Sequence, residues 1–89
     1  MTEPPGYAVI FAPRAAQDLE RLTPLDAARL RRPILQLAFE PRPPGAAIVV
    51  GTDLWRIRVG ELRVIYRIDD AQIVVARVAR RSERTYRRL

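Results

Sequence analysis

Four arginines, Arg56, Arg58, Arg63 and Arg67, are the side chains best suited to bind an anion, because each guanidinium offers several donors in a fixed plane. They lie in residues 54–69, where apolar residues alternate on both sides of Gly60-Glu61. This pattern predicts a β-hairpin with a two-residue loop, and glycine in its first position suits a type II′ turn. Counting outward predicts these pairs: Val59 with Leu62, Arg58 with Arg63, Ile57 with Val64, Arg56 with Ile65, and Trp55 with Tyr66.

Side-chain alternation gives this hairpin an apolar face and an arginine face. Arg58 directly opposite Arg63 places like charges together, which by itself destabilises a sheet. We interpret the pair as a site for an anion. An ordinary solvated face is the alternative, although such a face would mix charges of both signs. The apolar face comprises Trp55, Ile57, Val59, Leu62, Val64, Tyr66 and Ile68, and the arginine face comprises Arg56, Arg58, Arg63 and Arg67, with Leu54 and Ile65 beneath them.

Length and composition predict one small domain spanning residues 1–89. The chain has no cysteine and no histidine, which excludes disulfides, thiolate metal sites, a cysteine nucleophile and a histidine base. Its net charge is +6, and all 16 basic residues are arginine. A GC-rich genome would explain arginine in place of lysine, but the positive excess favours a polyanionic partner such as nucleic acid.

Neither a membrane anchor nor an export signal is expected. No apolar run approaches the ~20 residues of a membrane span. The first residues, Met-Thr-Glu-Pro-Pro, lack the basic and apolar regions of a signal peptide. We therefore expect a cytoplasmic protein.

The N-terminal half predicts one strand and two helices. A strand is expected over residues 7–11, a helix over 13–22 and a second helix over 24–39. In the first helix, Ala15, Leu19 and Leu22 should face the core, and Arg14, Gln17, Asp18 and Arg21 should point mostly outward. Thr23 caps the second helix, whose core stripe is Ala27, Leu30, Ile34, Leu37 and Ala38. Pro33 should kink that helix, at a cost of ~3 kcal/mol.

After a loop over residues 40–45, strands are expected over 46–50, the central hairpin and 73–79, followed by a basic tail over 82–89. With Asp70-Ala71 as the last loop, Arg77 falls on the apolar face. Either that loop is longer, or the guanidinium extends to water. With this two-residue loop, side chains of the last strand alternate between the faces. Ile73, Val75 and Ala79 then lie on the apolar face, and Val74, Ala76, Val78 and Arg80 lie on the arginine face.

The element order predicts an α+β fold: an N-terminal strand, two helices, then a 3–4-stranded, mostly antiparallel twisted sheet. Both helices should cover the apolar face and leave the arginine face open. Trp55 and Tyr66 are interpreted as core residues, with base stacking as the alternative. Asp69-Asp70 is interpreted as a turn, because an adjacent carboxylate pair without partners does not hold a metal.

Residues 55–70, WRIRVGELRVIYRIDD, resemble the signature of the RelE/ParE toxin superfamily, in its RelE-like branch. Residues 7–11 and 16–22, the loop 40–43 and the end 78–87 fit the same pattern in order and spacing. The resemblance implies a microbial-RNase-like α+β fold and the toxin of a type II toxin–antitoxin system. RelE-like toxins cleave mRNA in the ribosomal A site through attack of the 2′-hydroxyl on the adjacent phosphate, with no metal or other cofactor.

The resemblance also implies roles for five residues. Arg56 and Arg58 match the basic pair on the first hairpin strand, and Arg63 matches the arginine on the second. Arg81 matches the basic residue after the last strand, and Tyr86 the tyrosine of the tail. Arg58 and Arg63 would stabilise the phosphorane-like state, Arg56 would hold the phosphate or orient the 2′-hydroxyl, Arg81 would stabilise the leaving oxygen, and Tyr86 would stack on a base. Further RNA contacts are expected from Arg67, Arg80, Arg84 and Arg87.

Three departures from the family pattern matter. Arginine stays protonated, so with no lysine or histidine the general base is open among Glu61, Glu83, Tyr86 and the ribosome. Sheet parity favours Arg80 in the site, whereas the motif favours Arg81, which we prefer. Ala79 stands where many relatives have glycine, which could alter how the tail leaves the sheet.

Two other functions use the same residues. One is a ParE-like gyrase inhibitor, and the other is a non-catalytic arginine-rich module that binds nucleic acid or an acidic protein. In every case a partner is expected: an acidic, partly disordered antitoxin that folds on the sheet or the helices and forms a hetero-oligomer. Ribosome and mRNA are the further partners that the resemblance implies.

Overall fold

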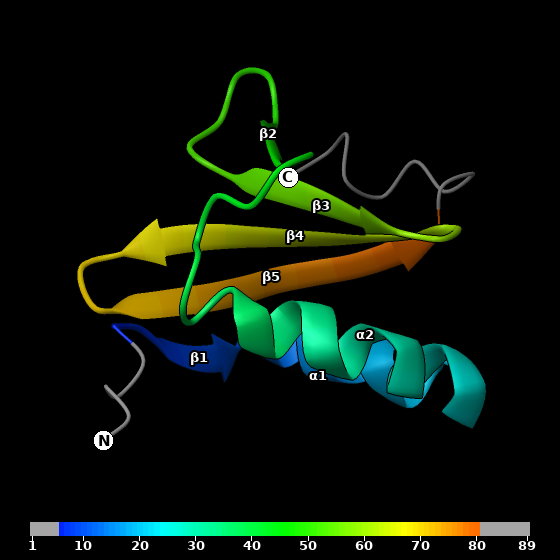
Figure 1. The fold of residues 1–89 in the computed structure, drawn as a ribbon. Coiled ribbons are helices and arrows are strands. Elements are labelled where there is room, and N and C mark those ends of the chain that lie inside the picture. The colour runs from blue at the N-terminus through cyan, green and yellow to red at the C-terminus, as the bar shows by residue number, and fades with distance from the viewer. Residues whose placement is uncertain (1–5, 81–89) are drawn as a thin grey trace.

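The computed structural model, which describes residues 6–80, is a five-stranded sheet with two helices on one face (Figure 1). The strand order is β1-β5-β4-β3-β2, and only the β1–β5 pair is parallel. The predicted α+β class is confirmed, with the N-terminal strand as part of the same sheet. The elements are β1 (Ala8–Phe11), α1 (Pro13–Glu20), α2 (Pro24–Gln36), β2 (Ala47–Ile48), β3 (Trp55–Val59), β4 (Leu62–Asp69) and β5 (Gln72–Arg80).

Both helices begin at proline, where the missing N–H costs no hydrogen bond. Thr23 caps α2 as predicted, and its side-chain oxygen accepts a hydrogen bond of 3.2 Å from the Asp26 amide. Helix α2 continues through Pro33. Each helix is shorter than predicted, since residues 21–22 and 37–39 form tight turns closed by bonds to the third residue back. Strand β2 is likewise shorter than the predicted 46–50.

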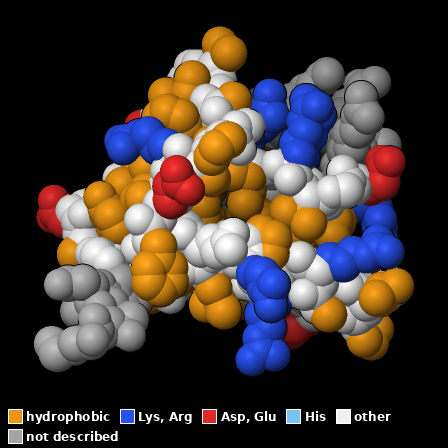
Figure 2. All heavy atoms as spheres, in the orientation of Figure 1, with side chains coloured by type: hydrophobic (Ala, Val, Ile, Leu, Met, Phe, Trp, Pro, Cys, Tyr) orange, Lys and Arg blue, Asp and Glu red, His pale blue; other side chains and the backbone are white. Residues whose placement is uncertain are grey.

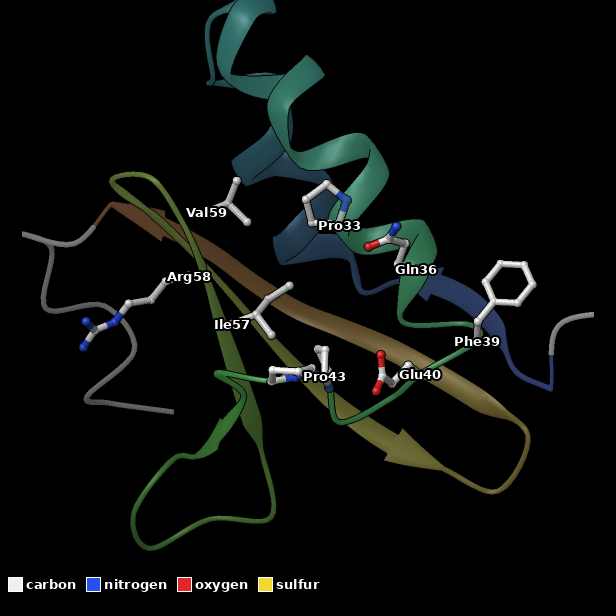
Figure 3. Close-up of a pocket in the computed structure, with 9 residues that line it drawn as sticks. Pro33, Gln36, Phe39, Glu40, Pro43, Ile57, Arg58 and Val59 are labelled. Carbon is white, nitrogen blue, oxygen red and sulfur yellow. The ribbon is translucent and has the colours of Figure 1, made fainter.

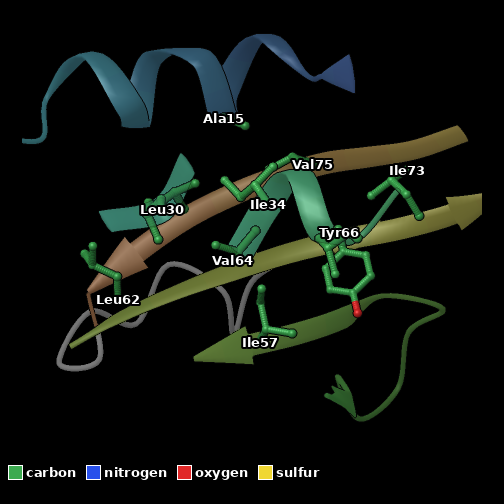
Figure 4. Close-up of a cluster of buried hydrophobic side chains, with 11 residues drawn as sticks. Ala15, Leu30, Ile34, Ile57, Leu62, Val64, Tyr66, Ile73 and Val75 are labelled. Carbon is green, nitrogen blue, oxygen red and sulfur yellow. The ribbon is translucent and has the colours of Figure 1, made fainter. Parts of the chain in front are cut away.

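The core lies between the helices and one face of the sheet (Figure 4). Trp55 packs partly buried against it, and Tyr66 is fully buried, so their interpretation as core residues is confirmed. The Tyr66 hydroxyl donates a hydrogen bond of 2.6 Å to the Pro41 carbonyl, which ties the loop after α2 to the sheet. Burial raises the pKa of Tyr66 to about 12. The core side chains are Ala15, Leu30, Ile34, Leu37, Ile57, Leu62, Val64, Tyr66, Ile73, Val75 and Val78.

The β3–β4 hairpin has the predicted register at all five pairs, including Arg58 opposite Arg63. Gly60 has a φ of 59°, as the first position of a type II′ turn requires. The β4–β5 hairpin also has a two-residue loop, because Asp69 pairs with Gln72. Asp70 adopts the left-handed region with a φ of 44°, which confirms the predicted turn.

A β-bulge in β5 overturns the predicted parity of the last strand. Tyr66 pairs with Val75 and Ile65 pairs with Arg77, so Ala76 is the extra residue. From that point every side chain of β5 faces the side opposite to the predicted one. Val78, predicted on the arginine face, lies opposite Val64 in the core. The predicted faces of Ala79 and Arg80 are also wrong, since they lie opposite Arg63 and Leu62 respectively.

Asp18 resolves the conflict over Arg77 in a way that neither sequence-based alternative anticipated. Its carboxylate accepts hydrogen bonds from Arg77 Nε at 2.9 Å and Nη2 at 3.2 Å, and from the Val78 amide at 2.9 Å. The Asp18 and Arg77 side chains are only 11% and 10% exposed. The expectation that Asp18 points outward is therefore wrong. Its carboxylate joins α1 to β5 directly after the bulge.

The Asp18 carboxylate remains charged in this position. Burial raises the pKa of Asp18, but the hydrogen bonds from Arg77 and Val78, together with the charges of Arg77 and Arg14, outweigh this effect. The net pKa is below its ordinary value. The folded state therefore stabilises the ionised carboxylate.

Replacing Asp18 with asparagine should lower the free energy of unfolding by about 3 kcal/mol, because it leaves the buried Arg77 charge without its counter-ion. Urea denaturation at pH 7 measures this change. Asp26→Asn is the matched control, since Asp26 binds Arg80, whose side chain is 46% exposed. This control should lose no more than about 1 kcal/mol. Equal losses in the two variants would contradict the prediction.

The difference in free energy of unfolding between the native chain and Asp18→Asn should also depend on pH, which gives an independent check of the contact. Because the pKa of Asp18 is lowered on folding, its stabilisation is complete above the ordinary aspartate value of about 3.9 and is lost as the pH falls through the lower folded-state pKa. The stability gap between the native chain and Asp18→Asn should therefore shrink between pH 5 and pH 2. A gap that is constant over this range would contradict the assigned contact.

Candidate nucleic-acid interface

Arg58 and Arg63 come from facing positions on β3 and β4, so both side chains project from the same face of the sheet. Figure 3 shows Arg58 on the side of β3 away from Ile57 and Val59, which point toward α2. Arg56 and Arg67 belong to this face by strand alternation. Sequence reasoning therefore placed the four hairpin arginines together correctly.

This arginine face is less open than predicted. Arg63 is 8% exposed and Ile65 is fully buried, whereas Arg58 and Arg67 are exposed. Arg63 is buried partly because it lies on a central strand, between Arg58 on β3 and Ala79 on β5. Arg67 lies 3.9 Å from the Asp69 carboxylate. The face thus combines one buried guanidinium with exposed ones.

The loop after α2 adds a cation that the sequence analysis did not select. The Arg42 guanidinium lies 5.2 Å from the centre of the Trp55 ring, a cation–π arrangement that covers this ring. A hollow of about 430 Å³ lies next to this loop, lined by Pro44, Gly45, Arg56, Ile57 and Arg58. In the sequence Arg42 stands between Pro41 and Pro43, and nothing local indicates its contact with Trp55, which lies beyond β2 at the start of β3. Figure 2 shows arginine side chains in several separate places on one side of the molecule, with apolar side chains between them.

Arg80, a predicted RNA contact, does not lie on the arginine face. Arg80 lies on the helix side, where its Nη2 is 2.8 Å from the Asp26 carboxylate. Its predicted position on the arginine face is therefore wrong, because the bulge reverses the strand before it. The predicted residues Arg81, Arg84, Tyr86 and Arg87 lie outside the described residues.

The chemistry available on the arginine face is anion binding. Guanidinium groups remain protonated at any physiological pH, so they neutralise and orient a phosphate but do not remove a proton. Tyr66 is no base for this face, since it lies in the core and burial raises its pKa to about 12. Glu61, at the hairpin tip, is the candidate base within the described residues.

The described residues hold neither a metal site nor a membrane-spanning helix. Within residues 6–80, no three acidic, histidine or cysteine side chains gather closely enough to hold a metal ion. None of the described helices has the length and apolar character needed to cross a membrane.

Solved structures share this fold. The chain is similar to one from the toxin–antitoxin complex RelBE2 of Mycobacterium tuberculosis, with 28% identity, a TM-score of 0.76, and coverage of 85% of this chain and 99% of that one. It is also similar to one from the archaeal RelE–RelB complex of Pyrococcus horikoshii OT3, with 26% identity, a TM-score of 0.72, and coverage of 88% and 98%. A chain from the chromosomal ParDE system of P. aeruginosa has 12% identity, a TM-score of 0.70, and coverage of 86% and 98%, which shows the fold alone.

The fold and the arginine hairpin thus define a toxin of the RelE/ParE type. The sequence model described as the ParE toxin of the type II toxin–antitoxin system parDE matches residues 9–85, and the chain belongs to this family. A search of the curated proteins gave no match. The predicted superfamily is confirmed. Its RelE-like and ParE-like branches act on different cellular targets, so membership of the superfamily does not by itself identify the activity of this toxin.

Removing one facing arginine should weaken the binding of single-stranded RNA in a salt-dependent way. Each phosphate contact contributes about 0.7 to the slope of log affinity against log salt concentration. Arg58→Ala and Arg63→Ala should each lower this slope by about that amount, measured by fluorescence anisotropy with a 2′-O-methyl oligonucleotide that cannot be cleaved. Arg21→Ala, an exposed arginine at the end of α1, is the control and should keep the native slope. Equal slopes for all variants would exclude the arginine face as a phosphate site.

Proposed function

We propose that this toxin is a ribosome-dependent, metal-independent endoribonuclease that cuts mRNA and thereby inhibits translation. The observation that carries the proposal is the direct pairing of Arg58 with Arg63 across a tight hairpin, on the sheet face away from the helices. Two guanidinium groups on one face of the sheet bring planar arrays of N–H donors to the same place, and such arrays match the non-bridging oxygens of a phosphodiester.

In the proposed reaction, the 2′-oxygen forms a bond to the adjacent phosphorus while the bond from phosphorus to the 5′-oxygen breaks. The products are a 2′,3′-cyclic phosphate and a free 5′-hydroxyl. Arg58 and Arg63 stabilise the extra negative charge on the equatorial oxygens, since guanidinium donors match that geometry. Arg56 holds the phosphate or orients the 2′-hydroxyl. From the tail, Arg81 stabilises the leaving oxygen and Tyr86 stacks on a base.

Proton transfer has to come from a group other than arginine. The chain has no histidine and no lysine, which leaves Glu61, Glu83, Tyr86 or a group of the ribosome as the base. A base supplied by the ribosome would also make cleavage depend on the ribosome. Action on ribosomes would place the toxin in the cytoplasm.

A second function, inhibition of DNA gyrase, is favoured by two specific observations. The family whose sequence model matches is the ParE toxin, and members of that branch inhibit gyrase. A toxin that only binds its target also needs no general base, which suits a chain without histidine or lysine. This function predicts DNA damage signalling with intact mRNA.

An antitoxin is the proposed protein partner. The similar chains with 28% and 26% identity come from a toxin–antitoxin complex and from a RelE–RelB complex. With a net charge of +6, this toxin should bind an acidic antitoxin, encoded by the neighbouring reading frame, in a hetero-oligomer.

Expression of the toxin alone should arrest growth and produce cut ends within translated messages. Arg58→Ala and Arg63→Ala should each reduce cleavage by a purified ribosome–mRNA complex at least about 100-fold, because each removes a donor aimed at the developing charge. Primer extension measures the cut ends. Arg21→Ala should cleave at the native rate.

The alternatives give different results in the same experiment. Growth arrest with an intact message and induced DNA damage signalling would replace the ribonuclease proposal with gyrase inhibition. Binding to ribosomes without any cut product would indicate the non-catalytic module. Cleavage that persists when both arginines are changed would show that another part of the chain holds the phosphate.

A further inference from the structure

A hollow of about 600 Å³ lies between the end of α2, the following loop and β3 (Figure 3). Its walls are mostly apolar, with Pro43 and Ile57 among the lining residues. Three polar side chains also line it, those of Gln36, Glu40 and Arg58. Pockets for small organic groups have volumes of about 300–1,000 Å³ and combine apolar walls with a few polar groups that orient the ligand. This hollow has both properties.

The hollow adjoins the arginine face. Pro44, Ile57 and Arg58 also line the hollow of about 430 Å³ to which Arg56 contributes, so the two spaces share these residues. Figure 3 shows that the Arg58 guanidinium extends away from Ile57, toward the arginine face. A phosphate bound there would carry its own sugar and base next to the larger hollow. The natural occupant of this hollow is therefore part of the same RNA strand.

Gln36 and Glu40 stand one helical turn apart at the end of α2. The Glu40 amide donates a hydrogen bond of 2.9 Å to the Gln36 carbonyl, so the helical spacing persists here and both side chains lie on one side of the chain. Figure 3 shows both across the hollow from Ile57. Glu40 has no ion-pair partner within residues 6–80, and the neighbouring Arg42 lies over the Trp55 ring instead. The Glu40 carboxylate can thus accept hydrogen bonds from a ligand.

This carboxylate determines which part of an RNA strand fits. It repels phosphate, and it accepts hydrogen bonds without donating any. Guanine has two adjacent donor groups on its Watson–Crick edge, N1–H and the N2 amino group, which match the two oxygens of one carboxylate. Adenine, cytosine and uracil each have a single donor group on that edge, with an acceptor next to it. The O6 acceptor of guanine lies beside N1 and matches the amide donor of Gln36.

We propose that this hollow binds a guanine base of the RNA strand whose phosphate lies at Arg58 and Arg63. The Glu40 carboxylate accepts hydrogen bonds from N1–H and the N2 amino group, and the Gln36 amide donates one to O6. The faces of the ring pack against the apolar walls, which removes them from water. The inference rests on the proposed binding of RNA and adds a base preference to it.

The test is the binding of uncleavable 2′-O-methyl oligonucleotides, measured by fluorescence anisotropy. Each strand consists of uridines with one central guanosine, inosine, adenosine or cytidine. The native toxin should bind the guanosine strand at least about 10-fold more tightly than the adenosine or cytidine strand, as expected for one bidentate contact with a base. The inosine strand should have an intermediate affinity, because inosine lacks the N2 amino group.

Two variants with matched chemistry locate the contact. Glu40→Gln replaces one acceptor with a donor and should remove the preference for guanosine. Glu20→Gln makes the same change at an exposed position at the end of α1 and should keep the preference. Gln36→Ala should weaken the guanosine and inosine strands by similar factors, because both bases carry O6. Thermal melting establishes that each variant is folded.

Each outcome decides the proposal. A preference for guanosine that Glu40→Gln removes and Glu20→Gln keeps supports it. Equal affinities for all strands, in binding that still depends on Arg58, overturn the base site and leave the phosphate site in place. A preference for another base, or a guanosine preference that Glu40→Gln keeps, also overturns it. No binding of any strand overturns it as well, and the cleavage of ribosome-bound mRNA then decides the ribonuclease proposal separately.

Discussion

The contact between the Asp18 carboxylate and β5 is the interaction on which the arrangement of this small domain depends. One side chain binds the Arg77 guanidinium and the Val78 amide, just beyond the last residue of β5 that pairs with β1, Val75. A buried ion pair needs hydrogen bonds to offset the loss of hydration, and here two from the guanidinium and one from the backbone reach the carboxylate. It fixes α1 against the sheet directly beside the bulge.

The bulge at Ala76 gives the end of β5 its orientation. It turns Val78 into the core and brings Arg80 to the helix side, where the N-terminal turn of α2 supplies Asp26. Both helices are thereby joined to β5 by a carboxylate. The same reversal places Ala79, a small side chain, directly opposite Arg63 on the arginine face.

The two sides of the sheet carry different kinds of side chain. On one side, Arg63 is nearly buried next to the exposed Arg58, and low exposure strengthens the attraction between a guanidinium and an anion. On the other side, the helices cover the apolar core.

Features that depend on residues close together in the chain could be predicted from the amino-acid sequence. The alternation of apolar and polar residues around Gly60 predicted the register of the arginine hairpin. The cap at Thr23 and the proline at Pro24 predicted where the second helix begins. These features follow from turn geometry and side-chain period, which involve residues a few positions apart. The assignment of the four hairpin arginines to one face required nothing more.

Features that join distant segments could not be predicted, because they depend on how the folded chain packs. The Asp18–Arg77 pair spans 59 positions in the sequence, and neither residue signals the other locally. The bulge at Ala76 has no glycine to indicate it, so the parity count failed from there onward, and with it the predicted faces of Val78 and Arg80. The burial of Arg63 was also beyond the sequence, because exposure depends on which segments pack around a central strand. A strand's period reports which residues share a face, whereas packing decides how much of that face meets water.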